Sequence, residues 1–176
     1  MSTPTRYYPG VVGLLLGVVQ VGYFLQLSLN MSSSFSTYLL VTLCWLIGSG
    51  LGAVWLHRLP VPTNGYLVLL LVAYGVCAAL VTAAPFDAQM RLIYGALVII
   101  SGVYPGVFFA RLGKTHHAQS LFFMENNGFI AGLVIATLAF LVIGRVALWG
   151  LPVVLCAVLF LIAPLPLPIH PTPETA

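Results

Sequence analysis

Residues 102–132 read GVYPGVFFARLGKTHHAQSLFFMENNGFIAG, and they join two long apolar segments through the most polar loop of the chain. The stretch holds two of the six Lys and Arg residues, two of the four histidines and one of the three acids, Glu125. Polar groups in apolar surroundings cost free energy unless they are bonded or used. The stretch therefore predicts two membrane helices that turn back on one another, with Glu125, Asn126 and Asn127 as a candidate polar site.

The composition excludes a water-soluble globule. The chain has 176 residues, of which 61% are hydrophobic and 5% are charged, whereas a soluble domain carries roughly 25% charged residues. So few polar residues cannot cover a water-exposed surface, so we predict an integral membrane protein in contact with the lipid bilayer. The net charge of +3 comes from scattered residues, and no nucleic-acid partner is predicted.

The order of apolar segments predicts an all-α, polytopic fold. A spanning helix needs about 20 mostly apolar residues. Six such segments give a six-transmembrane-helix bundle over 10–165, between an N-terminal segment 1–9 and a Pro-rich tail 166–176. The expected helices are 10–29, 37–56, 65–84, 91–110, 121–143 and 147–165. The loops are short, and no soluble domain is expected.

The distribution of Lys and Arg predicts the orientation. With six spans, both termini lie on one side of the membrane. That side collects four basic residues and the other side two: Arg6, Arg58, Arg111 and Lys114 against Arg91 and Arg145. Cytoplasmic loops are enriched in Lys and Arg. We therefore predict cytoplasmic termini and a multi-pass location in the bacterial cytoplasmic (inner) membrane.

Glycine spacing is the clearest packing signal. Two glycines four residues apart lie on one helix face and let a neighbouring backbone approach closely. Four such pairs occur: Gly13 and Gly17, Gly48 and Gly52, Gly102 and Gly106, and Gly128 and Gly132. They predict a compact bundle, and Pro105 predicts a kink in the fourth helix.

Glu125 is expected about one turn into the fifth helix. An acid inside a membrane segment is a functional-site hypothesis by default, and it could relay a proton or bind a cation or polar substrate. The structural alternative is a cap or a hydrogen bond near the interface, and Asn126 and Asn127 are expected to bond between helices. Gln20 and Gln26 lie near one face of the first helix; either they line a polar cavity with Glu125, or neighbouring helices satisfy them.

The cytoplasmic side carries a group of basic residues: Arg58, Arg111, Lys114, His116 and His117. We predict that they contact anionic lipid headgroups or a partner protein. A metal site of His57 with His116 or His117 is a less favoured alternative. No metal or cofactor is predicted, and Cys44, Cys77 and Cys156 are expected to be small buried apolar residues. Motifs for hydrolases, nucleotide binding and zinc proteases are absent, so no enzyme is predicted.

Three sequence patterns resemble one family. They are G-x-x-x-G-V-F-F-A-R-L at 102–112, F-F-M-E-N-N-G-F-I-A-G-L at 122–133 and LIGSGLGAVWLHRL at 46–59. Together with Leu16 and Gly17 through Gln20 and Tyr23, they resemble the membrane region of fused spermidine synthase-like bacterial proteins, which is major-facilitator-like. The resemblance covers most of residues 10–165. The glycine-rich turn and aspartates of that family's aminopropyltransferase domain are not found, so its enzymatic activity is not implied.

These observations favour a non-enzymatic membrane subunit that anchors or scaffolds a larger complex, with other membrane or soluble subunits as partners. The first alternative is a half-size major-facilitator-like transporter that acts as a dimer, with Glu125 and Gln20 on its path. The second is a quinone- or haem-associated redox subunit.

Overall fold

The computed structural model describes residues 3–31, 34–114 and 117–162. Within these ranges the chain forms six long α-helices, two short 3₁₀ helices (Leu56–Arg58 and Ala88–Met90) and no strand. The α-helices are α1 (Thr3–Ser28), α2 (Ser34–Val54), α3 (Thr63–Ala83), α4 (Arg91–Leu112), α5 (Ala118–Ile143) and α6 (Arg145–Ile162).

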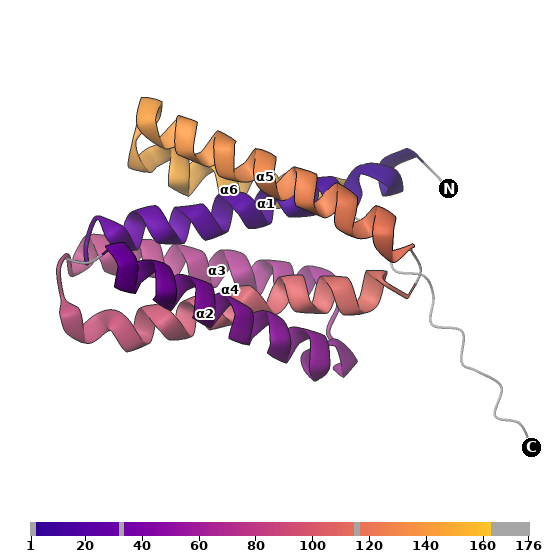
Figure 1. Ribbon diagram of the computed structural model, residues 1–176, viewed down its shortest axis with the longest axis horizontal. Coiled ribbons are helices and arrows are strands. Elements are labelled where there is room, and N and C mark those ends of the chain that lie inside the picture. The colour runs from indigo at the N-terminus through magenta and orange to yellow at the C-terminus, as the bar shows by residue number, and fades with distance from the viewer. Residues whose placement is uncertain (1–2, 32–33, 115–116, 163–176) are drawn as a thin grey trace, which may run out of the picture.

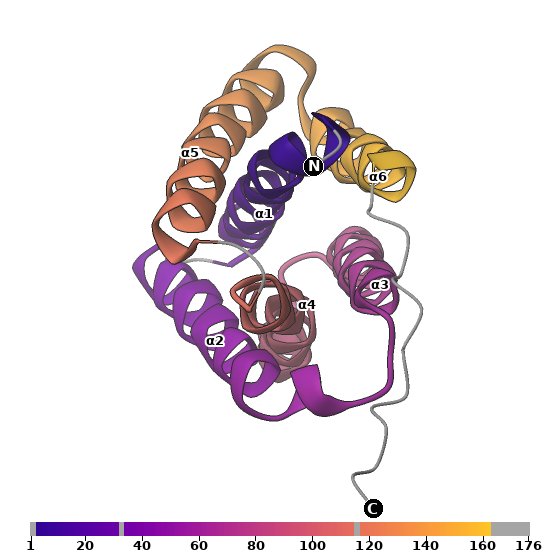
Figure 2. The ribbon, with the colours of Figure 1, turned by 90° about the vertical axis from the view of Figure 1, so that its right-hand side faces the viewer.

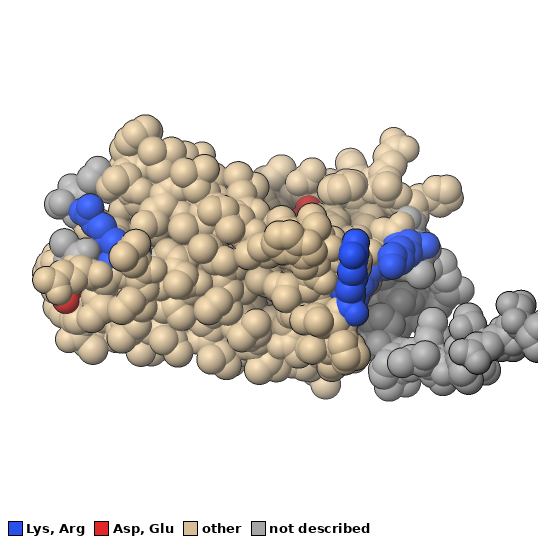
Figure 3. All heavy atoms as spheres, turned by 90° about the horizontal axis from the view of Figure 1, so that it is seen from below, with Lys and Arg blue, Asp and Glu red and all other residues tan. Residues whose placement is uncertain are grey.

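Each of the six helices contains a segment of 18 to 26 residues that is apolar enough to cross a membrane. The prediction of an all-helical, multi-pass protein is confirmed to that extent. Figure 3 shows the Lys and Arg side chains gathered near the two ends of the elongated molecule, with a band between them that shows no Lys or Arg and one small spot of Asp or Glu. An apolar band of this kind is the surface that lipid tails require.

The largest difference from the expected boundaries is at the start of α1. The helix begins at Thr3 rather than at residue 10, so most of the predicted N-terminal segment is helical. Pro4 lies in the first turn, where no intrahelical N–H bond is lost, and Pro9 is accommodated inside the helix. The predicted tail, 166–176, lies outside the described residues.

The six helices form two layers of three. One layer contains α1, α5 and α6, and the other contains α2, α3 and α4 (Figure 1; Figure 2). Within each layer a central helix, α1 or α4, packs against both of its neighbours. These two central helices are also the most deeply buried. The start of α1 and the end of α6 lie at the same end of the bundle (Figure 1).

The first layer is held by a seam of four glycines between α1 and α5. Gly13 and Gly17 of α1 face Gly128 and Gly132 of α5. A Cβ atom at any of these positions would overlap a backbone carbonyl oxygen of the opposite helix; the oxygens belong to Glu125, Phe129, Gly10 and Leu14, respectively. Only glycine permits this close approach of two helix backbones.

The second layer repeats the same seam between α2 and α4. Here Gly102 and Gly106 of α4 face Gly48 and Gly52 of α2. The overlapped carbonyl oxygens belong to Trp45, Ser49, Ile99 and Val103. The contacts correspond position by position, with α4 in the place of α1 and α2 in the place of α5. Because α1 and α4 run in opposite directions (Figure 1), the two seams between the first three and the last three helices are related by an inversion that exchanges α1 with α4 and α2 with α5.

Buried polar side chains link the two layers. The Tyr23 hydroxyl of α1 and the Ser101 hydroxyl of α4 are 2.6 Å apart. Gln26 of α1 donates from Nε2 to the Tyr74 hydroxyl at 2.7 Å, and that hydroxyl donates to the Leu148 carbonyl oxygen at 2.8 Å. Gln26 is thus hydrogen-bonded to a neighbouring helix, which agrees with the structural alternative for this residue.

Candidate functional site

A groove runs along one edge of the bundle between α2 and α5, where the two layers part. It has two adjoining parts with volumes of about 250 and 430 Å³, and the Phe129 side chain lines both. We call it the α2/α5 groove and define it by the side chains of Gln20, Thr42, Trp45, Ser49, Glu125 and Phe129. Since α2 belongs to the first three helices and α5 to the last three, the groove lies between the two repeated halves.

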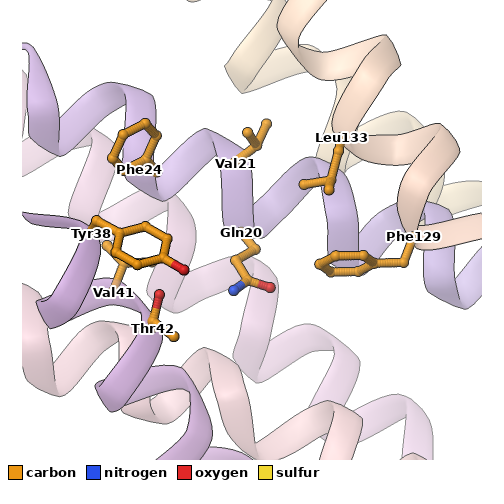
Figure 4. A pocket seen from close by; sticks show the side chains of 8 residues that line it. All are labelled: Gln20, Val21, Phe24, Tyr38, Val41, Thr42, Phe129 and Leu133. Atoms are coloured by element: carbon orange, nitrogen blue, oxygen red, sulfur yellow. The ribbon is translucent and has the colours of Figure 1, made fainter. Parts of the chain in front are cut away.

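The smaller part of the groove contains Gln20. Figure 4 shows the Gln20 amide of α1 and the hydroxyl groups of Tyr38 and Thr42 of α2 directed toward the same space. Phe129 and Leu133 of α5 close the other side with apolar surface. Gln20 lies more than halfway along α1, so these polar groups are well away from the ends of the helix. This part can therefore hold a small group that forms hydrogen bonds while its remaining surface is apolar.

The larger part of the groove contains Glu125, whose side chain is only 7% exposed. Among the described residues no hydrogen bond or ion pair reaches its carboxyl group. Because α5 begins at Ala118, Glu125 lies about 10 Å along the helix, at two turns rather than the expected one. The Ser49 hydroxyl beside it donates to the Gly102 carbonyl oxygen at 3.1 Å. Glu125 is thus a shielded carboxyl group that faces an open groove.

Asn126 and Asn127 do not join Glu125 in this groove. Successive residues of a helix point about 100° apart, so neighbours in sequence face different surroundings. Both amide side chains are exposed, and Asn127 donates from Nδ2 to the Phe123 carbonyl oxygen of its own helix at 2.6 Å. Of the four residues predicted as one polar site, the structure brings together only Gln20 and Glu125, in the two adjoining parts of the groove.

Arg111, expected to contact lipid or a partner, is engaged within the chain. Its guanidinium donates to the carbonyl oxygens of His57, Leu59 and Val61 at distances between 2.7 and 3.2 Å. It also lies over the Tyr66 ring, 5.5 Å from the ring centre. The end of α4 thereby fastens the α2–α3 loop. The sequence offered a signal for this contact, because the loop HRLPVPTN leaves several carbonyl groups without helical partners.

The other basic residues lie at the same end of the bundle. Arg58, Lys114 and His117 have exposed side chains, and His116 lies outside the described residues. In the described ranges, no group of three or more His, Cys, Asp or Glu side chains is placed to hold a metal ion. The exposed side chains are available to anionic headgroups or to a partner, which remains a prediction.

The comparisons with known proteins give no match: no protein-family model matches the chain, and neither does any curated protein or solved structure. The resemblance to the membrane region of fused spermidine synthase-like proteins therefore stays a prediction.

Proposed function

We propose that the chain is a half-size transporter that acts as a dimer, with two α2/α5 grooves facing each other across the interface. The observation that carries this proposal is the shielded Glu125 carboxyl group in a groove between two inverted, matching halves. In transporters built from inverted repeats, substrate and coupling-ion sites lie at the interface between the repeats. The sequence alone favours an anchoring subunit, whereas the groove and its carboxyl group support transport.

A second copy explains the polar lining of the groove. Polar side chains at membrane depth face a bundle interior or a water-filled cavity rather than lipid. Two grooves placed face to face would enclose Gln20, Thr42 and Glu125 of both copies in one path. The transporter does no covalent chemistry. We place it in the bacterial cytoplasmic membrane, with the Arg58 and Lys114 end in the cytoplasm.

Site-specific disulfide formation tests the dimer. Leu46 of α2 lines the groove and is 60% exposed, whereas Leu161 of α6 is 85% exposed and lies outside it. With the partly exposed Cys44 replaced by serine, Leu46→Cys is expected to form a disulfide-linked dimer in native vesicles, and Leu161→Cys is the matched control. Equal cross-linking at both positions, or none at Leu46→Cys, would contradict the proposed interface.

Reconstituted vesicles test transport itself. The purified protein is placed in proteoliposomes that contain a pH-sensitive dye, and a panel of organic solutes is added outside. We expect at least one solute class to change the internal pH with the wild type and not with Glu125→Gln, because the carboxyl group is the only acid in the groove. Asp87→Asn is the control, since the Asp87 carboxylate lies in the turn before α4, where it accepts a hydrogen bond from the backbone N–H of Gln89. The absence of flux with every solute would contradict transport.

The second candidate is the anchoring subunit, and the surface of α5 favours it. Of its 26 residues only Leu121, Glu125, Gly132 and Ala136 are buried. The exposed apolar residues of the helix, among them Phe123, Ile130 and Leu138, are available to lipid or to a larger partner. Native electrophoresis of solubilised membranes separates the candidates. A stable species larger than a dimer, dissociated by Ile130→Asn on the outer face of α5, supports anchoring.

A further inference from the structure

We propose that the larger part of the α2/α5 groove binds a lipophilic organic cation, such as an alkylated or arylated ammonium ion. The Glu125 carboxylate supplies the counter-charge, and the rings of Trp45, Phe109, Phe122 and Phe129 supply the walls. This inference rests on the same groove as the proposed transport function and names its substrate class.

Charge is the first feature that points to a cation. Glu125 is only 7% exposed, and its carboxyl group has no hydrogen-bond or ion-pair partner among the described residues; no Lys, Arg or His lines this part of the groove. A carboxylate in such surroundings is stabilised by a positive charge nearby, and without one it takes up a proton and becomes neutral. The described residues supply no positive partner, because Arg58, Arg111 and Lys114 lie at the end of the bundle and Arg111 is bonded to the α2–α3 loop. A cationic ligand supplies the positive charge that keeps Glu125 ionised.

The aromatic lining is the second feature that points to a cation. Four rings border the same space as the carboxyl group. Phe109 of α4 and Phe122 of α5 are stacked, with ring centres 4.8 Å apart and planes inclined by 18°. Trp45 is 7% exposed, so its ring is fixed by packing. Aromatic faces attract cations, and indole attracts them most strongly. An apolar helix bundle does not need four rings around its only groove carboxylate, whereas a site for a bulky cation does.

The site lacks the ligands that a small metal ion needs. A metal ion or Na⁺ requires several oxygen ligands. The side chains that line this part of the groove offer only the Glu125 carboxylate and the Ser49 hydroxyl oxygen, which are too few. A large organic cation spreads its charge over apolar groups and needs no coordination shell. The volume of about 430 Å³ lies within the range of small-molecule pockets, roughly 300 to 1,000 Å³.

Equilibrium dialysis of radiolabelled tetraphenylphosphonium against the purified full chain in detergent tests the site. We expect saturable binding to the wild type, at least ten-fold weaker binding to Glu125→Gln, and several-fold weaker binding to Phe122→Leu, whose ring is half exposed and can be shortened without disturbing the core. Asp87→Asn is expected to bind like the wild type. Neutral triphenylphosphine oxide, which has similar rings and no charge, is expected not to compete.

Thermal unfolding of each variant provides the control for folding. Equal binding by the wild type and by a Glu125→Gln protein that is shown to be folded would overturn the cation site, and so would effective competition by the neutral compound. If both variants unfold at room temperature, Glu125→Asp, which keeps the charge, must retain binding for the proposal to stand.

The binding assay has no membrane and no gradient, so its result is independent of transport. Binding without flux in vesicles would leave the ligand class standing and remove the transport function. Glu125-dependent flux of another solute, without tetraphenylphosphonium binding, would remove the ligand class and leave transport standing.

Discussion

The two glycine seams have the same backbone packing but carry different side chains into the groove. The contact of Gly13 with the Glu125 carbonyl group corresponds to the contact of Gly102 with the Trp45 carbonyl group. The α1–α5 seam therefore places a carboxyl group in the groove at the position where the α2–α4 seam places an indole. The contacts of the glycines with backbone carbonyl groups of the facing helix therefore fix the separation of the helices, whichever side chain the neighbouring position carries. The chemistry of the groove can then vary without a change of fold.

Replacing a seam glycine by alanine is expected to lower stability the most. Gly17→Ala and Gly106→Ala each introduce a Cβ that overlaps a carbonyl oxygen of the facing helix, and overpacking of this kind costs typically 1–3 kcal/mol. We expect the two variants to lower the free energy of unfolding in detergent by about the same amount, about 3 kcal/mol.

The matched controls are Gly50→Ala and Gly75→Ala, whose added Cβ would meet no atom within 4 Å. Both are expected to be neutral or to stabilise their helices by up to about 1 kcal/mol. A large loss at Gly17→Ala with none at Gly106→Ala would show that the two seams are not equivalent.

A medium effect is expected where the two halves differ in their loops. The α2–α3 loop is fastened by Arg111, whereas the corresponding α5–α6 connection is a turn at Gly144, whose φ is 77°. Lysine cannot reproduce a forked set of N–H donors, so Arg111→Lys is expected to destabilise the protein by about 1–2 kcal/mol.

Limited proteolysis at residues 57–62 is the measurement for this variant. We expect faster cleavage there than in the wild type, and no change with Lys114→Ala, whose side chain is exposed. Unchanged cleavage in Arg111→Lys would mean that the prolines of the loop hold it without help from α4.

The smallest change in stability is expected at Glu125, the position that corresponds to Trp45 in the other seam. Glu125→Leu replaces a shielded carboxyl group that has no partner among the described residues with an apolar one of similar size. We expect the midpoint of thermal unfolding to rise, by the equivalent of about 1 kcal/mol. Asn127→Leu, on the outer side of the same helix, serves as the control. A fall as large as that of the glycine variants would show that Glu125 braces the fold and is not held ready for a ligand.

Local pattern was enough to predict the helices and their packing positions. The lengths of the apolar runs placed five of the six helices within a few residues, because a membrane span has a fixed thickness to cross. The glycine pairs were identified as packing positions from their spacing, and the structure places all four of them in the two seams. The start of α1 was predicted too late, because the apolar run begins only near residue 10, whereas the helix extends back to Thr3 with Pro9 inside it.

The candidate site was only partly predictable. Glu125 and Gln20 stood out because polar residues are rare in apolar segments, but Asn126 and Asn127 carried the same signal and face away from the groove. Gln26 also resembled Gln20 in sequence, and it is bonded to Tyr74 in the interior. The aromatic lining was missed because Trp45, Phe109 and Phe129 come from three helices, and in this chain aromatic residues are too common to be singled out.

Hydrophobic length and glycine spacing were enough to predict an all-helical bundle of closely packed, membrane-length helices, because both act within single helices. The tertiary structure was needed to show which helices each seam joins, that the two seams are related by an inversion, and that one carboxyl group and four aromatic rings border the larger part of one groove. Those facts depend on the pairing and rotation of helices far apart in the chain. Rotation of about 100° per residue is enough to separate Glu125 from its neighbours in sequence and to bring it together with Trp45.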